Sequence, residues 1–307
     1  MTKNDEHQFL RLLLKANWVR HKVLAMGVLA KSGHITTGFS LAELFVTLYH
    51  GNILKYDPKN PKWPGRDRFI LSEGQAAIGI YPVLADIGFF PMEDLDKFLG
   101  KDSTLGVHSE PHTPGIEVLT GSLGHGLSIA SGMAYVAKLD NIDKKDRIVM
   151  CLTGDGELCE GSNWEALITI QSRNLDNLVL VVNRNHQFTI GRTDCIDTQR
   201  DIRLDPLAPK LESFGFEVRT VNGHDPLAIL AGFSDMRTRE AKTPLAIIAD
   251  TVKGFGASCL ADKRGWHYRV PKDDELLSVQ TDLENTRRTL QLTCDELIKE
   301  DNNEQRQ

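Results

Sequence analysis

Short apolar runs alternate with helical segments through the middle of the chain, and this alternation is the strongest constraint on its fold. The runs within 147–152, 178–182 and 245–249 are continuous, as expected for parallel strands covered on both faces. The other elements predicted in this region are a strand at 216–221 and helices near 163–172, 207–214 and 227–236. Strands that alternate with helices predict an α/β fold with a mostly parallel central sheet and helices on both faces.

The first third of the chain is predicted to be mainly helical. Apolar residues recur at helical spacing from 9 to 31, which predicts an opening helix. Ser40 and Glu43 have the spacing of a capping box, so a second helix is expected to begin with Ser40 as its N-cap. A strand at 68–72 should then lead into another apolar helix near 78–87.

Residues 1–280 are expected to form one domain, because no internal repeat or low-complexity linker interrupts them. Leu283, Leu290 and Leu297 indicate that 281–307 is a helical segment, and its polar tail is expected to fray. We expect this segment to pack on the core; the alternative is that it packs on a partner protein.

Composition and charge narrow the classes of function. Lys and Arg number 36 against 42 Asp and Glu, a net charge of −6, and no stretch is strongly basic, so nucleic-acid binding is not expected. The acidic start is unlike a signal peptide, and no apolar run approaches the ~20 residues of a membrane span. The five cysteines are widely spaced without a C-x-x-C pair, which favours a reducing cytoplasm.

Two polar side chains follow neighbouring predicted strands. Asp155 lies between two glycines after the first apolar run, and Asn185 follows the second run. Because ligands bind beyond the carboxyl ends of parallel strands, a carboxylate and an amide oxygen would converge there if the strands are adjacent. This oxygen set suits Mg²⁺, although Gly-Asp-Gly by itself is also a common turn.

The combination of motifs resembles a known family. Gly154-Asp155-Gly156-x-x-x-Glu160-Gly161-x-x-Trp164-Glu165-Ala166, with Asn185 thirty residues after the aspartate, is similar to the thiamine diphosphate-binding motif in its transketolase version. Further similar blocks follow in transketolase order: 32–34, 57–63, 66–72, 114–117, 120–126, 222–225, 251–254 and 266–267. The resemblance covers about residues 10 to 270 and implies the thiamine diphosphate-binding fold, in the form of its pyrophosphate-binding domain.

The resemblance implies a set of site residues. Magnesium would be held by Asp155, Asn185 and the backbone carbonyl of Gln187. The diphosphate cofactor would contact Gln75, Gly121, Ser122, Leu123, Gly154, Gly156, Asn185 and His267. The glycine-rich turn at 121–124 is also expected to present free backbone N–H groups to a polar ligand.

The resemblance also implies catalytic roles for His34, His108, His267 and Glu160. His34 and His108 would contact sugar hydroxyls and assist proton transfer, a role suited to a group that titrates near neutrality. Glu160 would meet its symmetry mate across a dimer interface. Each histidine could instead serve only in packing, and His112 competes with His108 for the same role.

The chain departs from the family pattern at three places. Gln75 stands where the family usually has a histidine near the diphosphate, and an amide can donate a hydrogen bond but cannot shuttle a proton. The usual Gly-Gly after the first histidine is replaced within 35–38, and Asn183 replaces an acidic residue two places before Asn185. These changes leave the metal set intact but put the ordinary sugar-phosphate substrate in question.

The resemblance predicts the amino-terminal subunit of a split transketolase. In the family the activating glutamate comes from a second, pyrimidine-binding domain, so a separate subunit should supply it, and two copies of each would form a heterotetramer. The expected reaction is transfer of a two-carbon ketol unit from a ketose, such as a sugar phosphate, to an aldose. The alternatives are another thiamine diphosphate-dependent carbon–carbon lyase or ligase, and a non-catalytic scaffold that retains the cofactor site.

Overall fold

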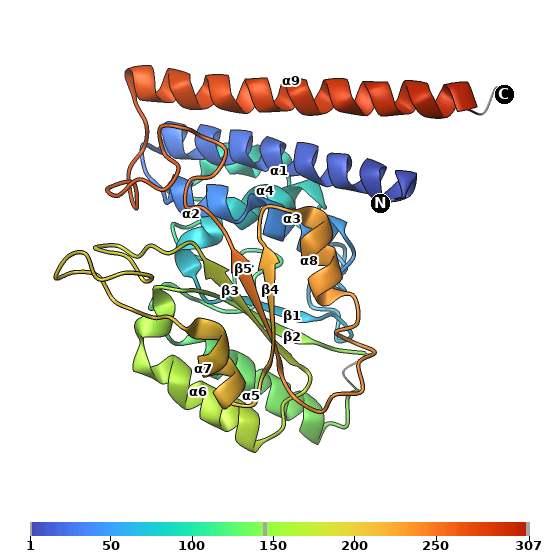
Figure 1. The fold of residues 1–307 in the computed structure, drawn as a ribbon, viewed down its shortest axis with the longest axis vertical. Coiled ribbons are helices and arrows are strands. Elements are labelled where there is room, and N and C mark those ends of the chain that lie inside the picture. The colour runs from blue at the N-terminus through green and yellow to red at the C-terminus, as the bar shows by residue number, and fades with distance from the viewer. Residues whose placement is uncertain (1, 144–145, 305–307) are drawn as a thin grey trace.

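A five-stranded, all-parallel sheet forms the centre of the molecule (Figure 1). The computed structural model describes residues 2–143 and 146–304. The strands are β1 (Arg68–Leu71), β2 (Val149–Gly154), β3 (Leu178–Arg184), β4 (Glu217–Asn222) and β5 (Leu245–Asp250). Their order in the sheet is β1-β2-β3-β5-β4. The predicted α/β fold with a parallel central sheet is confirmed.

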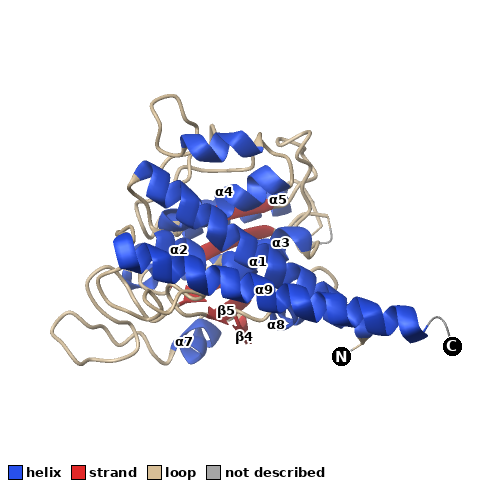
Figure 2. Cartoon of the chain, turned by 90° about the horizontal axis from the view of Figure 1, so that it is seen from above, coloured by secondary structure: helices blue, strands red, loops and turns tan. Residues whose placement is uncertain are grey.

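Helices cover both faces of this sheet (Figures 1 and 2). One layer contains α1 (Lys3–Ala30), α2 (Ile35–Ser40), α3 (Ala42–His50), α4 (Ala77–Asp86) and α8 (Pro226–Phe233). The opposite layer contains α5 (Gly126–Leu139), α6 (Gly161–Ser172) and α7 (Leu207–Ser213). The predicted helices near 78–87, 163–172, 207–214 and 227–236 are therefore all present, with ends that differ by up to three residues.

The side chains of β3 show why the apolar runs are continuous. Val179 and Val181 pack with the α1–α4 layer, whereas Leu180 and Val182 pack with α5, α6 and α7. Successive side chains of a strand point to opposite faces, and here each face is covered by helices. Both sets are therefore fully or almost fully buried, and polar residues enter β3 only at its carboxyl end, as Asn183 and Arg184.

The predicted start of the second helix is wrong. Ser40 is the last residue of α2, and its hydroxyl donates to the Thr37 carbonyl, while α3 begins after Leu41 without a side-chain cap. Glu43 is instead bound to Arg20 in the interior. A local capping pattern was thus overridden by a contact between distant parts of the chain. The first helix also starts earlier than predicted, at Lys3, because Thr2 and Asp5 form a capping box.

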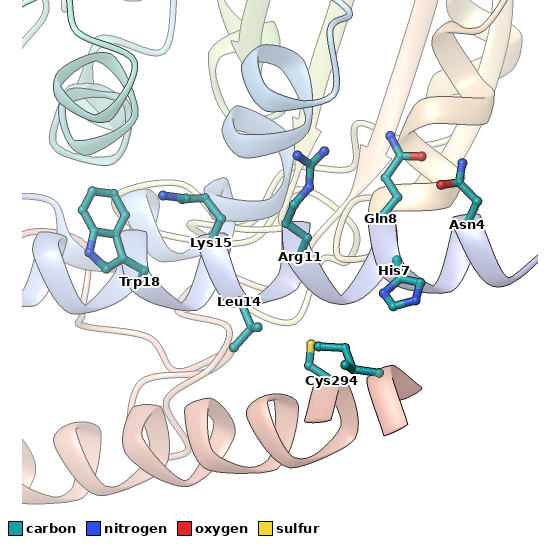
Figure 3. Close-up of a pocket in the computed structure, with 9 residues that line it drawn as sticks. Asn4, His7, Gln8, Arg11, Leu14, Lys15, Trp18 and Cys294 are labelled. Atoms are coloured by element: carbon teal, nitrogen blue, oxygen red, sulfur yellow. The ribbon is translucent and has the colours of Figure 1, made fainter. Parts of the chain in front are cut away.

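The last helix, α9 (Asp273–Glu304), begins before the boundary expected at 280/281. Its first half lies on α1, where Val279 and Leu283 are buried (Figures 1 and 2). Further along, a cavity of about 810 Å³ opens between the two helices, with Leu14 and Cys294 pointing toward each other across it (Figure 3). The end of the polar tail, 305–307, lies outside the described residues.

Two further sequence expectations can be set beside the structure. Across residues 2–143 and 146–304, no helix combines the length and apolar character needed to cross a bilayer. All five cysteines are free.

Candidate active site

Three predicted site residues, together with Lys253, follow the carboxyl ends of four adjacent strands. Gln75 follows β1, Asp155 follows β2, Asn185 follows β3 and Lys253 follows β5. A cavity of about 370 Å³ opens at this edge. Its lining includes Glu73, Gln75, Leu123, Gly154, Asp155, Gly156, Glu157, Glu160, Gln187, Lys253 and His267. Asn185 is not among its lining residues, whereas eight of the other predicted site residues are: Gln75, Leu123, Gly154, Asp155, Gly156, Glu160, Gln187 and His267.

Asp155 is held rigidly at the floor of this cavity. Its carboxylate accepts hydrogen bonds from the backbone N–H of Gly156 at 2.9 Å, the backbone N–H of His186 at 2.8 Å and the hydroxyl of Thr193 at 2.6 Å. These contacts orient the carboxylate. Oδ2 accepts two of them, so Oδ1, which accepts only the Gly156 N–H, is the oxygen that retains a lone pair for a cation. Burial raises the pKa of Asp155, and a bound cation would reverse this effect.

The segment that follows β3 lies directly against Asp155. Asn185 is buried, and its side-chain oxygen accepts the backbone N–H of Gln187 at 3.0 Å, which folds this segment into a tight turn. His186, between them, has a φ of 62° in the left-handed region. The turn at 185–187 therefore lies beside Asp155, and the role of these residues in holding a metal stays a prediction.

Two carboxyl groups that sequence reasoning missed also line the cavity. Glu73 accepts a hydrogen bond from the Asn183 amide at 2.9 Å. Glu157 accepts the backbone N–H groups of Gly124 at 2.9 Å and Gly154 at 3.2 Å. Burial raises the pKa of both carboxyls. Across the described residues, no three His, Cys, Asp or Glu side chains are placed to hold a metal ion together. A cation beside Asp155 would therefore also need amide and backbone oxygens, which is the donor set that the resemblance implies for Mg²⁺.

The glycine-rich loop lies beside Gln75. The side-chain nitrogen of Gln75 is 3.4 Å from the Gly121 carbonyl, while its buried side-chain oxygen has no partner among the described residues. Leu123 reaches the cavity lining, whereas Gly121 packs on the ring of His108 and Ser122 is exposed. The unpaired amide oxygen of Gln75 is free to meet a donor on a bound ligand or its hydration water.

Three of the predicted histidines form a cluster next to this cavity. The ring centroid of His34 lies 5.1 Å from that of His267 and 5.9 Å from that of His108. Tyr268, which sequence reasoning missed, lies 4.6 Å from His34, and its hydroxyl is 2.5 Å from the Ser32 hydroxyl. His112 is half exposed and faces Glu110 instead. The fold thus places His108, rather than His112, in the cluster.

Lys253 determines which nitrogen of His267 carries a proton. Lys253 is buried, and its Nζ lies 3.0 Å from Nδ1 of His267. Burial lowers the pKa of Lys253, and the Glu73 and Asp155 carboxyls act against this shift and favour the ammonium form. An ammonium can only donate, so Nδ1 accepts and the proton of the neutral ring resides on Nε2. Burial, together with the charge of Lys253, lowers the pKa of His267 to about 4. His267 therefore presents a neutral Nε2–H donor at neutral pH.

His34 does not titrate near neutrality as its assigned role led us to expect. Burial, aided by His267, His108 and Lys253, lowers its pKa to about 3. Its Nδ1 is buried without a partner among the described residues. In the free chain His34 is therefore a neutral ring poised for hydrogen bonding. Burial also lowers the pKa of His108.

This neutral His34 should make stability depend on pH. Between pH 6.5 and pH 5 the unfolded chain protonates this histidine and the folded chain does not, so stability falls as the pH falls. We expect His34→Gln to remove about 2 kcal/mol of that loss. Urea unfolding at the two pH values measures it, and equal losses in the variant and the wild-type chain would show that His34 becomes charged in the folded state.

Glu160 occupies the start of α6, where its side chain is exposed at the rim of the cavity. Ser162, two residues on, donates to the Gly124 carbonyl at 2.8 Å, so the start of α6 is fixed to the glycine-rich loop. The geometry leaves Glu160 available for a contact outside this chain.

A second cavity of about 570 Å³ adjoins the first. The two share part of their walls, namely Gln187, Phe188, Thr189, Ile190, Lys253 and His267. Arg200 and Arg264 add positive charge to the second cavity. Arg264 pairs with Asp201 at 3.2 Å, and the side chain of Arg200 is exposed. This chamber is suited to an anionic group close to His267.

The chain matches the model of the transketolase thiamine diphosphate binding domain over residues 15–303. It is 38% identical to one of the subunits of apulose-4-phosphate transketolase from Actinobacillus succinogenes over 264 residues, 85% of this chain and 92% of that protein. It is 35% identical to a 6-deoxy-6-sulfo-D-fructose transketolase subunit of a Clostridium species over 236 residues, 76% of this chain and 82% of that protein.

Among solved structures, the transketolase of Campylobacter jejuni superposes with a TM-score of 0.79 at 27% identity. The match covers 94% of this chain and 48% of that enzyme, so the chain spans about half the length of this transketolase. Fold and site together define a thiamine diphosphate-binding domain. The chain belongs to the transketolase family.

Proposed function

We propose that this chain is the thiamine diphosphate-binding subunit of a two-subunit transketolase. The observation that carries the proposal is the convergence of Asp155, Asn185 and Gln187 with a histidine cluster at one edge of the sheet. The chain's similarity to two transketolase subunits over more than four-fifths of their length supports it. The proposed reaction is transfer of a two-carbon ketol unit from a ketose to an aldose.

Asp155, Asn185 and the Gln187 carbonyl would hold Mg²⁺, which in turn would bind the diphosphate oxygens of the cofactor. When bound, thiamine diphosphate supplies the carbon nucleophile and the electron sink for cleavage of the ketose. Gly156 lines the cavity, and a glycine is needed there because a side chain would collide with Phe188. The Nε2–H of His267 and the Gln75 amide would complete the contacts to the cofactor.

The histidine cluster would bind the hydroxyl groups of the sugar, orient it and exchange protons with it. His34 and His108 would bind substrate hydroxyls as neutral rings, which can accept a proton at one nitrogen and donate one at the other. His267 would donate from Nε2 to an oxygen that gains negative charge during bond cleavage. Tyr268 and Ser32 would close the wall of the site beside His34 and restrict the shape of the substrate.

The substrate is proposed to carry an anionic group, most simply a sugar phosphate. The names of the two similar proteins refer to a sugar 4-phosphate and to a 6-sulfo sugar, both of which are anionic. In this chain, Arg200 and Arg264 line the chamber next to His267, where such a group could bind. Which ketose and aldose the enzyme uses depends also on the subunit that completes the site.

We propose a cytoplasmic heterotetramer with two copies of this chain and two of a partner subunit that carries the pyrimidine-binding domain. The exposed Glu160 at the rim supports contact with a second copy. An exposed apolar stripe on α5 and the adjacent α6 also supports this contact; it consists of Ile129, Val136 and Leu139 on α5 and Ile168 on α6. Burial of these side chains between two copies would favour self-association.

The proposal predicts that catalysis requires the partner. We expect the chain alone to show no ketol transfer, and the chain co-expressed with the product of the adjacent gene to convert ketose donors and a panel of aldehydes when supplied with thiamine diphosphate and Mg²⁺. Turnover by the purified chain alone would contradict the proposed division between two proteins. If the pair formed a complex that did not bind the cofactor, the scaffold alternative would be favoured.

A further inference from the structure

The loop that carries Lys253 is held from outside the cavity by His224. His224 lies in the turn between β4 and α8, and its Nε2 accepts the backbone N–H of Val252 at 2.8 Å. The same ring stacks on Phe255, with centroids 3.7 Å apart and an interplanar angle of 14°. His224 therefore contacts the loop on both sides of Lys253.

The partners of His224 determine its tautomer. Because Nε2 accepts a backbone N–H, it carries no proton, and the neutral ring must be protonated at Nδ1. Nδ1 lies 3.0 Å from Oε2 of Glu43, to which it donates. Histidines whose second nitrogen binds a carboxylate in this way are fixed in both ring orientation and tautomer.

Glu43 is itself immobilised in the interior. Both of its oxygens accept hydrogen bonds from Arg20, each at 2.6 Å, and Arg20 also donates to the Phe39 carbonyl. Burial opposes ionisation of Glu43, but Arg20 and His224 outweigh it and lower its pKa to about 2. A fixed carboxylate on α3 thus holds His224, which lies 181 residues further along the chain.

We propose that His224, oriented by Glu43, is a positioning residue that fixes Lys253 and thereby the tautomer of His267. His224 anchors the Val252 amide and Phe255, so the backbone on both sides of Lys253 is fixed. Lys253 then donates to Nδ1 of His267 and keeps the proton of that ring on Nε2, facing the cavity. We call this series of contacts, from Glu43 through His224 and Lys253 to His267, the relay. The relay is a property of this chain, and only its use in ketol transfer rests on the proposed function.

Nitrogen-15 NMR of the imidazole rings tests the relay directly in the full chain labelled with ¹⁵N-histidine. We expect the wild-type chain to show His267 protonated at Nε2. His224→Phe keeps the stacked ring but removes both hydrogen bonds, and should give a mixture of the two His267 tautomers. Lys253→Met should do the same with His224 intact. His224→Gln should retain the wild-type tautomer, because an amide offers an acceptor and a donor.

His21→Phe on α1 is the matched control, since His21 is a partly buried histidine outside the site, and it should leave the tautomer of His267 unchanged.

Calorimetry with thiamine diphosphate and Mg²⁺ should show affinity about 10- to 100-fold weaker in His224→Phe and near wild type in His224→Gln. Thermal unfolding establishes that each variant is folded. An unchanged His267 tautomer in folded His224→Phe would overturn the relay. Failure of the wild-type chain to bind the cofactor would count against the proposed function alone, because the NMR result does not depend on it.

Discussion

Asp155→Ala is expected to abolish magnesium-dependent binding of thiamine diphosphate. The substitution removes the one charged ligand of the proposed Mg²⁺ set and leaves only an amide oxygen and a backbone carbonyl, which are weak partners for a hard dication. We expect affinity to fall by at least about 100-fold, since loss of a group that merely supports a ligand already costs about 10- to 100-fold. Isothermal titration calorimetry with and without Mg²⁺ measures the change.

Two companion variants separate metal binding from folding. Thr193→Val removes the 2.6 Å hydrogen bond to Asp155 but keeps the ligands and the size of the side chain, so an intermediate loss of about 10- to 100-fold is expected. Glu296→Ala, on the exposed side of α9, should bind as the wild-type chain does. Unchanged affinity in folded Asp155→Ala would show that the metal assignment is wrong.

The positions of the strands could be predicted because burial on both faces forces a continuous apolar run. The residue at which β2 ends could not be predicted from an apolar run. The apolar run stops at Leu152, but Thr153 and Gly154 still pair with Val182 and Asn183 of β3. The length of β2 is determined by its pairing with β3, and the composition of β2 alone does not indicate it.

The site residues that the sequence analysis did not predict were missed for a different reason. Glu73, Glu157 and Lys253 come together only because the fold brings them to one cavity, where burial raises the pKa of the two carboxyls and lowers that of Lys253. Nothing in the local sequence of Glu73 or Glu157 distinguishes them from exposed charged residues, and Lys253 lies in the family-like block 251–254 without a predicted role in the site. Glu43 is the clearest case: its spacing from Ser40 favoured a capping role, whereas its partners Arg20 and His224 come from distant segments.

The choice between His108 and His112 was likewise settled only in three dimensions. Both histidines lie in the same loop and have similar surroundings in the sequence. The difference comes from Gly121, whose backbone approaches the His108 ring so closely that a side chain would not fit between them. The glycine-rich loop is therefore needed to seat a histidine of the cluster as well as to line the cofactor cavity.

Gly121→Ala should accordingly lower both stability and activity. Gly121 has a φ of 129°, in the region that favours glycine, and an added Cβ would lie 2.7 Å from Cγ of His108. The backbone strain alone is expected to cost about 1–3 kcal/mol of unfolding free energy. Relief of the collision would move His108 away from His34, and a shift of about 1 Å in a catalytic group can reduce the rate of the complex by about 100-fold.

Gly132→Ala is the matched control for the change in stability, measured on the single chain, because it adds the same methyl group to a glycine of α5 that has open space around it. In a helix interior this change should raise stability by about 0.5–1 kcal/mol. Urea unfolding of the chain and ketol transfer by the reconstituted complex provide the two measurements. If Gly121→Ala were as stable as Gly132→Ala and fully active, His108 would not depend on the close approach of the loop, and the role of Gly121 would be limited to its place beside the cofactor cavity.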